Sequence, residues 1–109
     1  MNIKQQEKGD ATILELEGSI DSKTTAEIQS KIMEVALTTQ KMVLVFSEVS
    51  FVSSAGLRLL LMIYRQVTSR SGKVILVDVS EEIRDIMEMT GFINFFEITE
   101  NLDEALKSI

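Results

Sequence analysis

Two short apolar segments constrain the fold of this 109-residue chain more than any other feature of its sequence. Met42–Phe46 is an uninterrupted apolar run of strand length, and Val74–Val79 has nearly the same character. A strand that is apolar at successive positions buries both of its faces, as strands do in the centre of a sheet that helices cover. The sequence therefore predicts an α/β domain built around such a sheet.

Weaker patterns supply the outer elements. Ile3–Glu7 is a weak strand candidate, and a turn at Lys8–Asp10 follows it. Alternation in Ala11–Glu17 predicts the return strand of a β-hairpin. Phe95–Ile98 is a candidate for a last strand. Helical spacing of apolar residues predicts four helices: one capped by Asp21 or Ser22, one running from Ser54 to about Gly72, one between Ser80 and Gly91, and a short one at Leu102–Leu106.

The resulting element order is β-β-α-β-α-β-α-β-α. No proline, repeat or low-complexity segment interrupts this order. We therefore expect a single domain over residues 1–109, with a mixed sheet of four to five strands covered by about four helices.

The composition excludes several classes of function. The chain has no histidine and no cysteine, which removes the most common general base, thiolate metal ligands and disulfides. We expect no enzymatic activity, no metal and no cofactor. A formal net charge of −6 disfavours nucleic acid and anionic lipid as partners. The first ten residues lack an apolar signal-peptide core, and no apolar run is long enough to span a bilayer, so we expect a cytoplasmic domain without direct membrane insertion.

The helix that begins near Ser54 carries two apolar residues outside its main apolar face. On a helical wheel the main face contains Leu57, Leu60, Leu61, Tyr64 and Val67, whereas Leu59 and Met62 lie on the other side, near Arg58. Either another helix covers Leu59 and Met62, or these two residues form a contact patch for a partner protein. The helical pattern alone leaves both interpretations open.

The junction "SFVSSAGLRLLL" joins a strand to that helix and places two serines, Ser53 and Ser54, at the helix start. One hydroxyl can cap the helix, whose first N–H groups lack intrahelical partners. Gly56 weakens a helix at this position, which indicates close approach by another backbone or another protein. A nucleophilic serine is excluded, because the chain has neither G-x-S-x-G nor a histidine base.

The stretch "LVFSEVSFVSSAGLRLLL" resembles the signature of the STAS domain family, the anti-sigma factor antagonists of bacterial partner-switching systems. "LEGSID" at Leu16–Asp21 is similar to an early turn of that family, and "MTGFINFFEI" at Met89–Ile98 to its late helix-to-strand segment. The resemblance implies a domain that binds an anti-sigma factor serine kinase and thereby frees a sigma factor. The kinase then phosphorylates the domain at a helix start, and a PP2C-type phosphatase reverses the modification.

Matched residue by residue, the resemblance places the phosphorylated serine at Ser54, with Ser53 as the alternative acceptor. Gly56 and Leu57 match the Gly-Leu of the family signature, and Asp21 matches the acid of the early turn. The residues expected at the partner interface are Asp21, Ser53, Ala55, Gly56, Arg58, Leu59 and Met62.

Two positions depart from the family pattern. Ser53 stands where the family often has Asp, and Val45 stands where it often has Asp or Asn within the preceding strand. If those acids help to position the acceptor hydroxyl, their loss would slow or abolish phosphorylation. The alternative function is therefore a STAS-like scaffold subunit, in a signalling or lipid-transport complex, that binds its partner constitutively.

Overall fold

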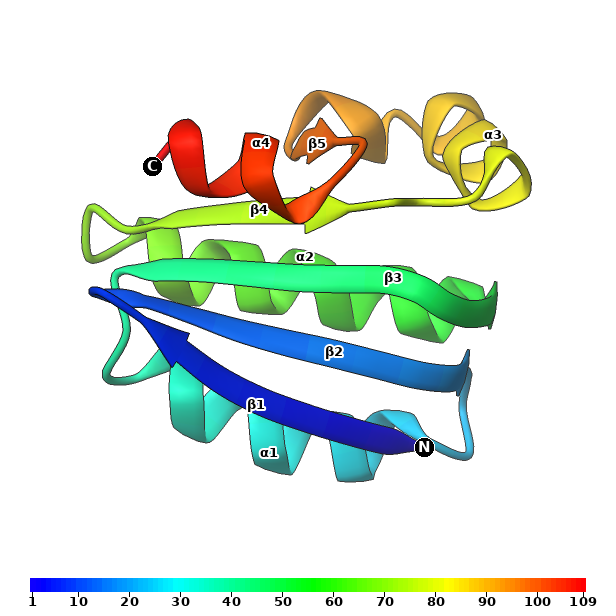
Figure 1. The fold of residues 1–109 in the computed structure, drawn as a ribbon. Helices are drawn as coiled ribbons and strands as arrows, with labels where there is room; N and C mark the ends of the chain where they lie inside the picture. The colour runs from blue at the N-terminus through cyan, green and yellow to red at the C-terminus, as the bar shows by residue number, and fades with distance from the viewer.

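The computed structural model describes all 109 residues and contains one five-stranded sheet in which the strands follow each other in chain order (Figure 1). The first two strands form an antiparallel hairpin, and every later pairing is parallel. The predicted mixed sheet is thus confirmed, with five strands. These are β1 (Asn2–Lys8), β2 (Ala11–Ile20), β3 (Lys41–Val52), β4 (Lys73–Val77) and β5 (Glu97–Thr99).

The helices alternate with the parallel strands as predicted, so the element order is also confirmed. They are α1 (Thr25–Ala36), α2 (Ser54–Thr68), α3 (Glu81–Thr90) and α4 (Leu102–Lys107), with a 3-10 turn, η1 (Phe92–Asn94), after α3. The predicted last strand starts two residues too early, because Phe95 still belongs to the end of this turn. None of the helices combines the length and the apolar character that crossing a bilayer requires.

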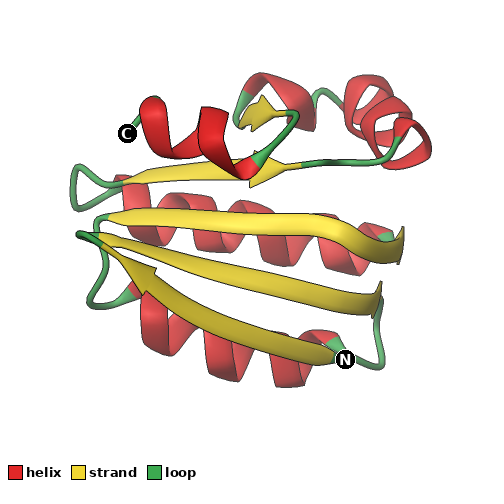
Figure 2. Ribbon diagram, in the orientation of Figure 1, coloured by secondary structure: helices red, strands yellow, loops and turns green.

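The two faces of the sheet are covered unequally (Figure 2). Helices α1 and α2 lie on one face and enclose, together with α3, the larger apolar core. The short α4 covers part of the other face, where a smaller cluster gathers around Val43 and Ile75. Neighbouring residues of β3 and β4, such as Leu44 and Leu76, point into the larger core. The two apolar runs are therefore explained by burial on both faces.

Side-chain caps set several helix ends. Ser80 accepts a hydrogen bond from the backbone N–H of Ile83 at 3.2 Å, and Gly91 ends α3 with φ at +80°. Both features match the prediction. The predicted cap of the first helix is wrong, because Thr24 is the N-cap of α1 and makes no capping bond with its side chain. The Asp21 carboxylate instead orders the turn that precedes the helix.

Candidate functional site

The carboxyl ends of β2 and β3 lie side by side, which brings two distant segments of the sequence together. β2 and β3 pair in parallel up to Ile20 and Val52. One residue later, the backbone N–H of Ser53 donates to the carbonyl oxygen of Ile20 at 2.8 Å. Asp21 directly follows Ile20, so Asp21 and the serine pair lie at the same end of the sheet.

Gly56 allows α2 to start directly against the end of β2. A Cβ atom at this position would lie 2.6 Å from the carbonyl oxygen of Ile20 and 2.8 Å from its Cγ2. The close approach that the sequence indicated is therefore made by the backbone of the chain itself. Gly56 is buried, so the expectation that it contacts a partner directly is wrong. Its role is to position the start of α2.

The two serines differ in their bonding. The Ser53 hydroxyl is half-buried and accepts a hydrogen bond from the backbone N–H of Gly56 at 3.1 Å, which makes Ser53 the N-cap of α2. Ser54 is the first residue of the helix. It is exposed, and its hydroxyl makes no hydrogen bond within the chain. Ala55, which follows, is half-buried. Of the two serines, only Ser54 thus offers an exposed hydroxyl that is free of hydrogen bonds within the chain.

Asp21 is held by a dense set of hydrogen bonds. Its carboxylate accepts from the backbone N–H groups of Lys23 and Thr24 at 2.9 and 3.2 Å, and from the Ser19 hydroxyl at 3.0 Å. These bonds, with the one from Lys23 foremost, hold the pKa of Asp21 below its ordinary value. The Thr24 hydroxyl closes the turn by donating to the Ser19 carbonyl oxygen at 2.8 Å. The turn therefore presents a fixed negative charge beside the start of α2.

The exposed side of α2 is narrower than the sequence indicated. Arg58 and Met62 are exposed, Met62 by 44%, in agreement with the expectation. Leu59 is only 3% exposed and belongs to the larger core, so its placement at the surface is wrong. The apolar sector of α2 is centred near Ile63 and extends around the helix far enough to include Leu59. Helix α1 packs against α2, and Leu59 is buried in the core to which both helices contribute, so the covered alternative holds for Leu59.

Phe51 is a surface residue that the sequence reasoning missed. It is 50% exposed and pairs in the sheet with Ser19, next to the Asp21 turn. Val52 beside it is buried. Strand alternation could have revealed this difference, because successive residues of a strand point to opposite faces. Phe51 adds an apolar contact surface to the serine end of the sheet.

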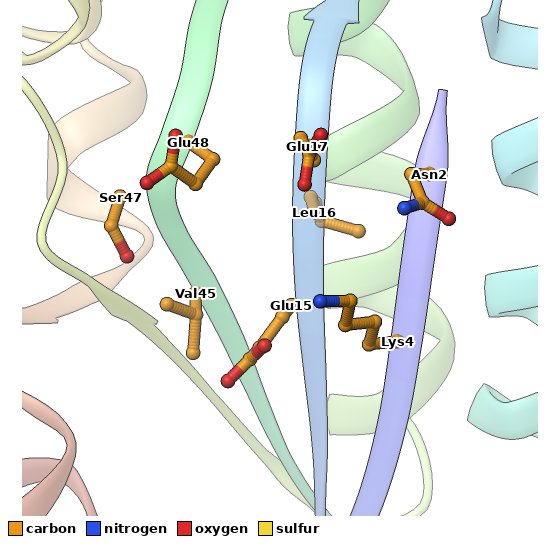
Figure 3. A pocket seen from close by; sticks show the side chains of 8 residues that line it. All are labelled: Asn2, Lys4, Glu15, Leu16, Glu17, Val45, Ser47 and Glu48. Atoms are coloured by element: carbon orange, nitrogen blue, oxygen red, sulfur yellow. The ribbon is translucent and has the colours of Figure 1, made fainter.

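A polar hollow lies elsewhere, on the part of the sheet that no helix covers (Figure 3). Neither Ser54 nor Asp21 lines it. Val45 does, and about 25 Å of strand separate Val45 from the serine pair at ~3.3 Å per residue. No group of three or more His, Cys, Asp or Glu side chains in the structure could hold a metal ion. The lining residues are Asn2, Lys4, Glu15, Leu16, Glu17, Val45, Ser47 and Glu48.

A comparison against known families identifies the family to which the fold belongs. The STAS domain family matches residues 2–105, almost the entire chain. The chain belongs to the STAS domain family. Among curated relatives, BtrV of Bordetella bronchiseptica, which is named as an anti-sigma factor antagonist, is 24% identical over 91 residues, covering 83% of this chain and 78% of BtrV.

Solved structures of other STAS proteins share the architecture. An anti-sigma factor antagonist of Thermotoga maritima superposes with a TM-score of 0.93 at 19% identity, over 98% of this chain and 93% of that one. SpoIIAA of Bacillus in its phosphorylated form superposes with a TM-score of 0.76 at 20% identity, over 98% of both chains. At these identities the comparison establishes the fold of this STAS domain.

Proposed function

We propose that this STAS domain is an anti-sigma factor antagonist that binds an anti-sigma factor serine kinase, and that phosphorylation of Ser54 ends this binding. The observation that carries the proposal is the free, exposed hydroxyl of Ser54 at the start of α2. BtrV, named as an antagonist of this kind, and the phosphorylated form of SpoIIAA give the proposal its precedent. The domain acts by binding rather than by catalysis.

Ser54 is favoured over Ser53 as the acceptor. A kinase needs a hydroxyl oxygen that can reach the terminal phosphate of ATP. The Ser53 oxygen already accepts the N–H of Gly56 and is half-buried, whereas the Ser54 oxygen has neither constraint. A phosphate on Ser53 would also disturb the cap of α2, which is worth about 1 kcal/mol.

The two departures from the family pattern are compatible with this switch. Serine and aspartate are comparably good N-cap residues, so Ser53 supplies the capping oxygen that an aspartate would provide. Val45 lies on a distant part of β3 and lines the polar hollow. A side chain that far from Ser54 has no direct means of orienting its hydroxyl. Neither substitution therefore argues strongly for the constitutive scaffold.

A phosphate can release a partner without any change of fold. It adds about −1.5 to −2 charges at neutral pH, which the N-terminus of α2 tolerates through its partial positive charge. Buried at an interface, the same group is bulky and strongly hydrated, and leaving it without a partner costs several kcal/mol. Each ~1.4 kcal/mol is a tenfold loss of affinity. A phosphatase of the PP2C type would then restore the binding form.

The test is to incubate the purified protein and ATP with each candidate anti-sigma factor serine kinase of the source organism, followed by intact-mass measurement and phosphosite mapping. We expect one added phosphate, located on Ser54. Ser54→Ala should abolish this modification, and Ser53→Ala should retain it as the matched control. A domain that binds such a factor but is never phosphorylated would instead be a constitutive scaffold.

A further inference from the structure

The exposed side of α2 carries an unneutralised positive charge. Arg58 and Arg65 are exposed, and the helix contains no acidic residue. Neither arginine takes part in the ion pairs of the structure. The chain has a net charge of −6 and α2 contributes +2, so the remaining residues carry −8. The surface of α2 is thus cationic on an otherwise acidic protein.

We propose that Arg58 is the internal counter-ion for a phosphate on Ser54, and that in the unmodified protein the same guanidinium pairs with a carboxylate on an acidic surface of the partner. The inference rests on the proposed function for the presence of the phosphate and the partner. It goes beyond that function by assigning the partner surface a charge and by giving one residue two alternative ion pairs.

The spacing supports the internal pair. Ser54 and Arg58 are four residues apart on one exposed stripe of the helix, which brings their Cβ atoms to about 5–6 Å. An acidic group four residues before a basic one is the favourable orientation for such a pair. The guanidinium also matches two phosphate oxygens at once.

No anionic side chain near Ser54 competes with a phosphate for the Arg58 guanidinium. Ser53, which precedes Ser54, is uncharged and occupied with Gly56. The Asp21 carboxylate is engaged by the donors of its own turn, Lys23 among them. A phosphate on Ser54 would therefore be the only anionic group on the exposed side of α2.

Charge complementarity identifies the occupant of this surface as an acidic protein surface. The two arginines of α2 favour carboxylates, and the exposed Met62 of the same helix supplies apolar contact beside them. A phosphate of about −1.5 to −2 charges would cancel the +2 of the helix almost completely. Phosphorylation would thus remove the electrostatic attraction between α2 and the acidic partner surface. It would also pair Arg58 with the phosphate instead of a partner carboxylate.

The pairing can be tested without a kinase or a partner. Phosphoserine is incorporated at position 54 by genetic encoding, and the phosphate is titrated by phosphorus NMR. The second pKa of the phosphate should be a few tenths of a unit higher in Arg58→Gln than in the parent, the scale of an exposed ion pair between neighbouring turns. Arg65→Gln, eleven residues from Ser54, should leave the pKa at the parental value. Equal values in the parent and Arg58→Gln would overturn the internal pair.

The acidic partner surface is tested with the unmodified protein and the anti-sigma factor that the phosphorylation assay identifies. Raising the salt concentration should weaken binding, and Arg58→Gln should weaken it several-fold while reducing the salt dependence. Lys107→Gln on α4 is the control, because Lys107 is exposed on a different face and forms no ion pair. Binding that is insensitive to Arg58→Gln and to salt would overturn the assignment of an acidic surface. If no anti-sigma factor binds at all, the proposed function fails, while the phosphorus titration still decides the role of Arg58.

Discussion

Gly56 of α2 faces the carbonyl oxygen of Ile20 so closely that a Cβ atom at position 56 would lie 2.6 Å from it. This contact joins the start of α2 to the end of β2, and it fixes the place of Ser54 relative to the Asp21 turn. The position of the proposed phosphorylation site is therefore set by how α2 packs on β2.

Gly56→Ala should destabilise the protein although alanine is the better helix former. The backbone carbonyl of Ile20 cannot move aside cheaply, so α2 must shift, at a cost of up to about 3 kcal/mol that outweighs the ~1 kcal/mol gain in helix propensity. Urea unfolding measures the difference. Arg65→Ala, on the exposed side of the same helix, should change the stability by less than ~0.5 kcal/mol. A Gly56→Ala protein that is more stable than the parent would show that the contact is not restrictive.

The two serines should respond differently to removal of their hydroxyls. Ser53→Ala leaves the N–H of Gly56 without its acceptor and should cost about 1 kcal/mol, whereas Ser53→Asp should retain most of the stability. Ser54→Ala should be close to neutral, because that hydroxyl makes no bond within the chain. Thermal and urea unfolding of the three variants check the order. If Ser54→Ala were the more damaging change, Ser54 would be the cap and the assignment would reverse.

Substitutions at Leu59 and Met62 should affect different properties: the first the stability of the fold, the second the affinity for a partner. Leu59→Ala creates a cavity in the larger core and should cost about 2–5 kcal/mol. Met62→Glu, on the exposed stripe, should leave stability within ~0.5 kcal/mol and weaken binding of an anti-sigma factor. Melting temperatures and a binding titration of both variants provide the measurements. A large drop in melting temperature for Met62→Glu would place Met62 in the core.

Asp21 should stabilise the fold in a pH-dependent way. The hydrogen bonds to its carboxylate lower its pKa in the folded state, so its contribution is present above its unfolded pKa, near ~3.9, and is lost as the pH falls through the folded value. The difference in unfolding free energy between the parent and Asp21→Asn should therefore shrink below pH ~4. Asp10, whose pKa is lowered by Lys41, titrates equally in both proteins and cancels from this difference. A constant difference between pH 6 and pH 3 would contradict the assigned cause.

The element order could be predicted because it rests on local patterns. Runs such as Met42–Phe46 report burial on two faces directly, and the caps Ser80 and Gly91 depend on only a few neighbouring residues. The family signature likewise located the serine junction before its geometry was known.

The orientation of α2 could not be predicted in full, because it depends on contacts between distant segments. Leu59 is buried in a core built from several elements, and a helical wheel of α2 alone contains none of the others. The choice between Ser53 and Ser54 required the positions of the Ser53 oxygen and the N–H of Gly56. Burial of Gly56 followed from the position of Ile20, more than thirty residues earlier in the chain.

The central claim is tested most directly by titrating the unmodified protein, Ser54→Ala and Ser54→Asp against the cognate anti-sigma factor kinase, under conditions without ATP. Ser54→Ala should bind as tightly as the unmodified protein, because the fold and the Ser53 cap are retained. Ser54→Asp should bind at least about tenfold more weakly, since it places a negative charge where the phosphate would lie, although one carboxylate carries less charge than a phosphate. Equal affinities for Ser54→Ala and Ser54→Asp would contradict the switch and favour the constitutive scaffold.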